Sequence, residues 1–248
     1  MSKLGLDLKT WHRPALKLAD YLHAEATPPA SVSRPHAGFQ WGTLANDRIG
    51  DCVIAMMLHS IEDFHLDAQT TPPPFTDQDA ISVYSAITGY NPDDPNSDQG
   101  TDESQAMKYW ESPGLDVEGK HTIAGTVSVD PSNLKECRIA IFEFAALQIG
   151  INLPLTAQGQ SEWTVVGDGK TGDSAPGSWG GHGIPYREYD AKTFTCVTWG
   201  EELQLTVPFH QTYAEEAHVV VTQEMLNRQG LSPSGLNWSR LTADLKAL

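Results

Sequence analysis

The sequence predicts an α+β fold in which a helical N-terminal lobe precedes a C-terminal lobe of antiparallel β-strands. A helical repeat of apolar residues is strongest over residues 51–66. Short segments with the alternation of β-strands follow residue 183. Between the two patterns, residues 167–183 contain seven glycines and therefore predict turns. Helices that come first and strands that come later are typical of an α+β fold with two lobes.

Three segments of the first half are expected to be helices, because apolar residues recur in them at every third or fourth position. Asp51 and Thr76 are suited to cap the first two helices. A weaker helical pattern covers residues 7–24 and is interrupted by Pro14. The three expected helices are residues 51–66, 76–88 and 102–110.

The second half is expected to be mainly β-structure. One further helix is predicted over residues 131–150, with Ser132 as its cap. The remaining segments show strand patterns separated by turn residues. The expected strands are residues 121–129, 151–156, 183–189, 193–199, 204–208 and 217–222.

Composition divides the chain into an arm, a domain and a tail. Residues 1–40 form the arm, which ends in a proline-rich linker, and residues 223–248 form a helical tail. The domain between them is expected to be mainly helical over residues 41–125 and mainly β over residues 126–222. The arm and tail either pack on this domain or contact a neighbouring copy or assembly partner.

The charge and the hydropathy of the chain argue against nucleic acid as a partner and against a membrane span. Its 248 residues include 32 acidic and 16 basic side chains, which gives a formal net charge of −16. Nucleic acid is not expected as a partner, because phosphate binding requires clustered lysine and arginine. No run of about 18 apolar residues is present, so a membrane span is not expected either.

The cysteines and the N-terminus indicate the compartment. Cys52, Cys137 and Cys196 are too few and too uneven in number for a disulfide framework. The N-terminus lacks the continuous apolar region of a secretory signal. We therefore expect a reducing environment, either cytoplasmic or in a virion, with Cys137 and Cys196 in the core.

Cys52 is the candidate nucleophile. It falls in the first turn of a predicted helix, where the helix dipole and unpaired N–H groups stabilise a thiolate. Asn46 lies six residues earlier, and its amide is suited to donate a hydrogen bond to an oxyanion beside the Cys52 N–H. The alternative is a buried, inert thiol that packs within a helix.

His182 is the candidate base. It follows two glycines and directly precedes a predicted strand, so the backbone can approach a helix N-terminus closely. A histidine that faces a helix N-terminus across a cleft has the arrangement that a Cys–His pair requires. The alternative is an ordinary loop histidine in a glycine-rich turn.

These motifs, in this order and spacing, resemble those of the papain-like cysteine peptidases. Asn46 occupies the position of the family's oxyanion glutamine, six residues before Cys52, and Gly50 matches a glycine two residues before the nucleophile. The Gly-Gly-His sequence that ends at His182 is followed by Trp199 and a glycine, as in the family. The general likeness is to divergent bacterial and phage-encoded members.

The resemblance covers roughly residues 40–222 and implies a two-lobed papain-like fold. It also implies hydrolysis of peptide or amide bonds in a peptide or protein substrate, without a cofactor or a metal. Catalysis would then use Cys52, His182 and Asn46. Three further positions resemble residues that line the family's substrate cleft, namely Gly100, Thr101 and Trp199.

The sequence departs from the family at the residue that orients the histidine. The family has asparagine where this chain has Val197, which cannot accept a hydrogen bond from an imidazole. Thr198 or Asp190 would have to take its place, or a Cys–His dyad would have to suffice. A second function therefore stays open: a papain-fold binding or structural protein without turnover, such as a phage particle or assembly component.

Two other motifs are rejected on their context. Residues 167–172 match the glycine pattern of dinucleotide sites, but no helix can begin directly after them. Residues 94–100 have oxygen-bearing side chains like a calcium loop, but the glycine and the final glutamate are misplaced. His59 and His65 are too far apart along a helix to share a metal.

Overall fold

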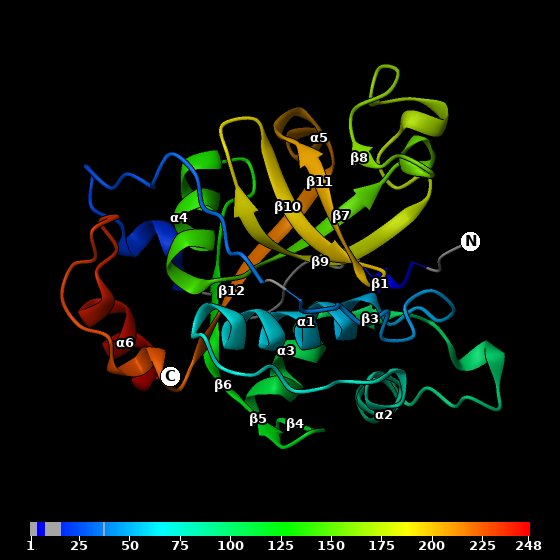
Figure 1. Cartoon of the computed structure of the whole chain (residues 1–248), viewed down its shortest axis with the longest axis horizontal. Helices are drawn as coiled ribbons and strands as arrows, with labels where there is room; N and C mark the ends of the chain where they lie inside the picture. Colours follow the sequence, from blue (N-terminus) through cyan, green and yellow to red (C-terminus); the bar gives the residue numbers. More distant parts are fainter. Residues whose placement is uncertain (1–3, 8–15, 37) are drawn as a thin grey trace.

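The structure is a computed structural model that describes residues 4–7, 16–36 and 38–248. A twisted sheet lies on one side of helix α1 (Cys52–Asp67), and helices α2 (Asp77–Thr88) and α3 (Glu103–Glu111) lie on the other (Figure 1). Helices precede most strands along the chain, which confirms the predicted α+β class. Among the described residues, no helix has both the length and the apolar character that a membrane crossing needs.

The sheet contains eight strands in the order β2-β6-β12-β7-β9-β10-β11-β8. All neighbours are antiparallel except the two edge pairs, β2 with β6 and β11 with β8. Two small pairs lie outside it: β1 (Leu6–Asp7) with β3 (Thr101–Asp102), and β4 (Leu115–Asp116) with β5 (Lys120–His121). The strands of the large sheet are β2 (Leu16–Lys17), β6 (Ile123–Ser128), β7 (Leu147–Leu153), β8 (Glu162–Trp163), β9 (Gly180–Tyr189), β10 (Thr193–Thr198), β11 (Glu201–Thr206) and β12 (Ala214–Thr222).

Helix α1 is the central element of the molecule. Its residues 52–63 are all buried, as expected for a helix that is covered by a sheet on one side and by helices on the other. The capping box of Thr76 and Asp79 starts α2, and the side chain of Asp102 caps α3. These short-range signals explain why the sequence located all three helices.

Two hydrophobic cores lie on the two faces of β12. Val219 and Val221 belong to the core of the β-lobe, whereas Val220 belongs to the core around α1, α2 and α3. Successive side chains of a strand point to opposite faces, so the alternation of β12 separates the two cores. Glu216 and His218 share the parity of Val220 and therefore face the helical lobe.

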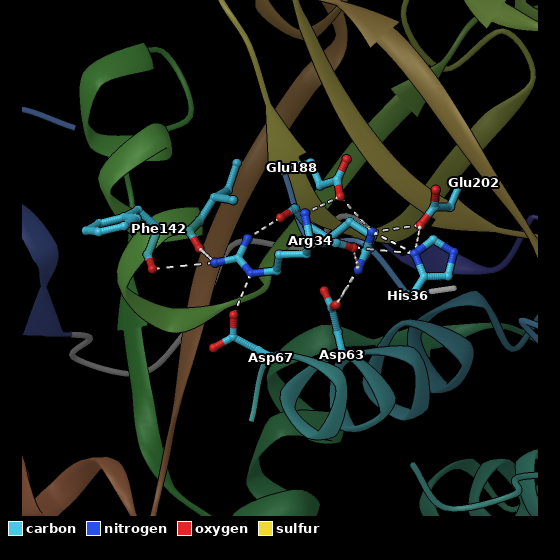
Figure 2. A network of polar contacts seen from close by, with 9 residues as sticks. Arg34, His36, Asp63, Asp67, Phe142, Glu188 and Glu202 are labelled. Atoms are coloured by element: carbon cyan, nitrogen blue, oxygen red, sulfur yellow. Dashed lines mark hydrogen bonds and ion pairs between the residues drawn. The ribbon is translucent and has the colours of Figure 1, made fainter. Parts of the chain in front are cut away.

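A partly buried polar network joins α1 to β9 (Figure 2). Arg187 of β9 is fully buried and donates hydrogen bonds to Asp63 of α1, at 3.0 and 3.2 Å, and to Glu202, at 2.7 Å. Arg34 donates to the Arg187 carbonyl and, at 2.8 Å, to Asp67 of α1. Each guanidinium binds a carboxylate of α1 and also a residue of the sheet, so the network fixes α1 against the sheet.

Parts of the predicted arm and tail pack on the main body. Residues 16–36 contribute β2 to the sheet, and Val32 forms a β-bridge with Tyr189. In the tail, α6 (Trp238–Lys246) buries Trp238 and Leu241 in the core of the β-lobe. The bounds that we predicted for arm, domain and tail, and contacts to other copies, stay predictions.

Two predicted elements of the second half are wrong in part. The helix expected over residues 131–150 is α4 (Leu134–Phe144), and β7 already begins at Leu147. The strand expected over residues 204–208 ends at Thr206, whose side chain caps an unexpected helix, α5 (Val207–Tyr213). Of the weak pattern at residues 7–24, residues 8–15 lie outside the described residues, and Leu18–Tyr21 form a 3-10 helix.

Candidate active site

Cys52 and His182 lie on α1 and β9, which pack against each other. Cys52 is the first residue of α1, and His182 lies in β9. The Gly183 N–H donates a hydrogen bond to Cys52 Sγ with an N–S distance of 3.4 Å. The candidate thiol therefore contacts Gly183, the residue directly after the candidate base, although Cys52 and Gly183 are 131 positions apart in the sequence.

Burial keeps both groups neutral in this conformation. Cys52 and His182 are each fully inaccessible to solvent. Burial raises the pKa of the Cys52 thiol to about 11, although the N–H groups of Gly183 and Gly5 act in the opposite direction. Burial lowers the pKa of His182 to about 3. Both shifts favour a thiol and a neutral imidazole over a thiolate–imidazolium pair while the two groups stay buried.

Thr198 contacts the imidazole of His182. The resemblance would give this role to an asparagine at position 197, where this chain has Val197. His182 Nε2 and Thr198 Oγ1 are 2.8 Å apart, and Nδ1 is buried without a hydrogen-bond partner. Trp199 stacks on the ring with a centroid distance of 4.8 Å and an interplanar angle of 17°. Asp190, the other substitute considered, accepts N–H groups within the turn after β9 instead. Nδ1 is thus the ring nitrogen left to exchange a proton.

Asn46 lies beside the start of α1, bound to Asp51. Its Nδ2 donates to Asp51 Oδ1 at 3.2 Å, and both side chains are buried. Asp51 is the N-cap residue, but its side chain makes no capping hydrogen bond, contrary to its expected role. Burial raises the pKa of Asp51 well above the ordinary range. The bond uses one of the two amide hydrogens of Asn46.

The N-terminal segment of the chain covers the thiol. The Thr101 N–H donates to the Gly5 carbonyl at 2.7 Å, and β1 continues this contact as a parallel pair with β3. A Cβ on Gly5 would lie 1.9 Å from Gly50 O, and one on Gly100 would lie 2.1 Å from Gly5 O. Only glycine allows such close backbone approach. The two positions expected to line a substrate cleft, Gly100 and Thr101, thus contact the chain itself.

The other two cysteines and a surface pocket lie away from Cys52. Cys137 and Cys196 are free and fully buried in the core, as expected. A surface pocket of about 450 Å³ lies at the opposite end of α1 from Cys52, between Phe64, Trp110 and Arg228. The coverage by Gly5 was missed from the sequence, because nothing local marks a contact between residues 5 and 100.

Solved structures resemble the chain over most of its length, whereas no protein-family model and no curated protein matches it. Xylellain, a cysteine protease from Xylella fastidiosa, is 13% identical with a TM-score of 0.66, over 89% of this chain and 96% of xylellain. Procathepsin L 3 of Tenebrio molitor larval midgut is 12% identical with a TM-score of 0.57, over 86% and 75% of the two chains.

A third solved structure also resembles this chain in its fold. The Carica candamarcensis cysteine protease CMS1MS2 is 12% identical with a TM-score of 0.52, over 78% of this chain and 99% of the protease. At such low identity these likenesses establish the fold, and they confirm the resemblance that the spacing of Asn46, Cys52 and His182 suggested. The chain has the papain-like fold of the cysteine proteases.

Proposed function

We propose that the protein is a thiol-dependent hydrolase of peptide or amide bonds, with Cys52 as nucleophile and His182 as base. One observation carries the proposal: Cys52 begins α1 against β9, next to a histidine with Nε2 held by Thr198 and an unpartnered Nδ1. A cysteine nucleophile, a base and a third group that orients the base are the parts that this chemistry requires.

The reaction would begin when His182 Nδ1 takes the proton of Cys52 Sγ. The thiolate attacks the substrate carbonyl carbon, and the Cys52 N–H and the Asn46 amide donate to the oxyanion. His182 then returns the proton to the leaving amine as the C–N bond breaks, which leaves a thioester on Cys52. Water, deprotonated by His182, hydrolyses the thioester and restores the thiol.

Catalysis requires residues 4–7 to leave the position that they occupy. The Gly5 carbonyl uses the Thr101 N–H, and the segment contributes to the complete burial of Cys52. Release of the segment would admit water, and hydration of the charged forms would lower the thiol pKa and raise the imidazole pKa. We therefore infer that the covered conformation is latent and that substrate competes with residues 4–7 for Gly100 and Thr101.

A second candidate function is a papain-fold binding or assembly protein without turnover. The neutral state of Cys52 and His182 favours it, as does Val197 at the position of the family's orienting asparagine. On this hypothesis residues 4–7 are a permanent part of the fold. The location of the protein in a cell or virion stays a prediction.

Hydrolysis of a fluorogenic peptide library separates the two functions. The full chain and a form that lacks residues 1–7 are assayed under reducing conditions, each with Cys52→Ala and His182→Ala variants. The hydrolase proposal expects cleavage by the shorter form that Cys52→Ala abolishes and His182→Ala reduces by a factor of about 10² or more. No cleavage by either form, although both remain folded, would favour the binding protein.

A further inference from the structure

Two glutamates and a histidine meet where the start of α3 faces β12. Glu103 is the first residue of α3, and Glu216 and His218 lie two positions apart on the helical face of β12. One ligand atom from each of the three side chains falls within 4.8 Å of the other two. Gly150 is the partner of Glu216 in the strand register, and its lack of a side chain makes room for the carboxylate.

The cluster is buried and leaves carboxylate oxygens unsatisfied. Glu103 is only 2% exposed and His218 only 3%. Glu103 Oε1 lies 3.2 Å from His218 Nδ1, but Glu103 Oε2 and Glu216 Oε1 are buried without a hydrogen-bond partner. A buried carboxylate oxygen without a donor is costly, because it has lost its hydration without replacement. Two such oxygens beside one imidazole leave a place for a cation, or for a proton that the carboxylates share.

The charge around the cluster points the same way. Glu103 and Glu216 bring two carboxylates together beside a single imidazole. Two negative charges at this separation repel each other unless a positive charge neutralises them. A divalent cation would do so.

We propose that Glu103, Glu216 and His218 bind one divalent transition-metal ion, Zn²⁺ by preference, which joins α3 to β12. Two carboxylates and an imidazole are ligands that zinc accepts, and water would complete a tetrahedral site. Zinc bonds of about 2.0–2.2 Å place neighbouring tetrahedral ligands about 3.3 Å apart. The 3.2 Å between Glu103 Oε1 and His218 Nδ1 already fits this spacing.

The competing explanation is a shared proton. Glu216 could remain protonated and donate to Glu103, while His218 forms an ion pair with the same carboxylate. This arrangement needs no metal and predicts no response of the protein to chelators or to zinc. The two explanations therefore differ in a directly measurable way.

Zinc binding is measured on the full untagged chain that carries Cys52→Ser, so that the candidate thiol cannot contribute. After dialysis against EDTA, Zn²⁺ is titrated by calorimetry, bound metal is counted by elemental analysis, and melting temperatures are compared with and without Zn²⁺. Glu103→Gln and Glu216→Gln test the ligands. Glu62→Gln is the matched control, because Glu62 forms an equally buried pair with His59, at 2.9 Å.

The proposal expects one Zn²⁺ per chain and a rise in melting temperature on zinc addition. Since loss of a group that only supports a ligand costs about 10–100-fold in affinity, loss of a ligand in Glu103→Gln or Glu216→Gln should cost at least about 100-fold. Glu62→Gln should bind as the parent does. The absence of stoichiometric zinc from the folded parent, or equal weakening by all three changes, would overturn the proposal.

Discussion

Substitution of Gly5 by alanine tests whether residues 4–7 keep the thiol unreactive. The added Cβ would lie 1.9 Å from the Gly50 carbonyl oxygen, a backbone atom that belongs to the turn before α1. Such a distance cannot be accommodated, so the segment must move away from Cys52. Gly42→Ala is the matched control, because its Cβ would meet the flexible end of Leu44 at 3.3 Å and the Phe75 carbonyl oxygen at an ordinary contact distance of 3.7 Å.

The size of the effect follows from the ionisation of Cys52. With a pKa of about 11, only about 0.03% of the thiol is ionised at pH 7.5, against about 9% at the reference pKa of about 8.5. This gain of about 300-fold is offset by about 10-fold, because a thiolate of lower pKa is intrinsically less nucleophilic. Alkylation should therefore accelerate at least about 30-fold, and new access to solvent adds to this factor.

The assay is the rate of alkylation by iodoacetamide at pH 7.5, with Cys137→Ser and Cys196→Ser in every variant. Gly5→Ala should react at least about 30-fold faster than the parent, and Gly42→Ala should not differ from it. If folded Gly5→Ala reacts as slowly as the parent, residues 4–7 do not control the thiol, and the latent state that we propose is wrong.

Three further predictions concern the groups around the site. Thr198→Val removes the partner of a buried imidazole and should lower the free energy of unfolding by about 1–3 kcal/mol in urea, with recovery in Thr198→Ser. Arg187→Met leaves Asp63 buried without its counter-charge and should cost about 3–5 kcal/mol, but much less when combined with Asp63→Asn. Folding favours neutral His182, since its pKa falls from 6.5 to about 3, so this contribution is complete above pH 6.5 and disappears as the pH falls toward 3. This contribution to the free energy of unfolding amounts to about 4–5 kcal/mol. Urea unfolding between pH 4 and 7 should therefore show a steep loss of stability toward acid pH, which His182→Gln makes shallower. Parallel pH profiles of the two proteins would contradict this prediction.

Local signals in the sequence were enough to predict the elements that carry the site. Caps and helical periodicity located α1, α2 and α3 to within one or two residues. The error after residue 144 has a physical cause: the apolar stretch of α4 runs on into β7, and periodicity cannot separate a buried helix from a buried strand. Ala145 ends the helix with a φ of 66°. Alanine rarely adopts a positive φ, so this helix end could not be predicted from the residue type.

The sequence indicates candidate residues that local motifs mark, and it does not indicate residues whose importance depends on contacts between distant parts of the chain. Cys52 and His182 are marked by a helix start and a glycine-rich strand start. Gly5 carries no comparable mark, because its close approach to Gly100 exists only in the folded chain. The same holds for Glu103 and His218, which are 115 positions apart and follow no metal-binding spacing. No metal was expected from the sequence for that reason.

The geometry of Cys52 and His182 does not depend on an attraction between them. Burial disfavours the charged form of each group, and at this end of α1 the Gly183 N–H donates a hydrogen bond to Cys52 Sγ. The position of α1 against β9 is instead fixed by the close approach of Gly183 to Val53 and Met56 and, further along both elements, by the charged contact between Asp63 and Arg187. No hydrogen bond joins the two side chains in the covered state, because His182 Nδ1 has no partner. On the proposed function, release of residues 4–7 would therefore have to bring Cys52 Sγ and His182 Nδ1 within hydrogen-bond distance as well as change their ionisation.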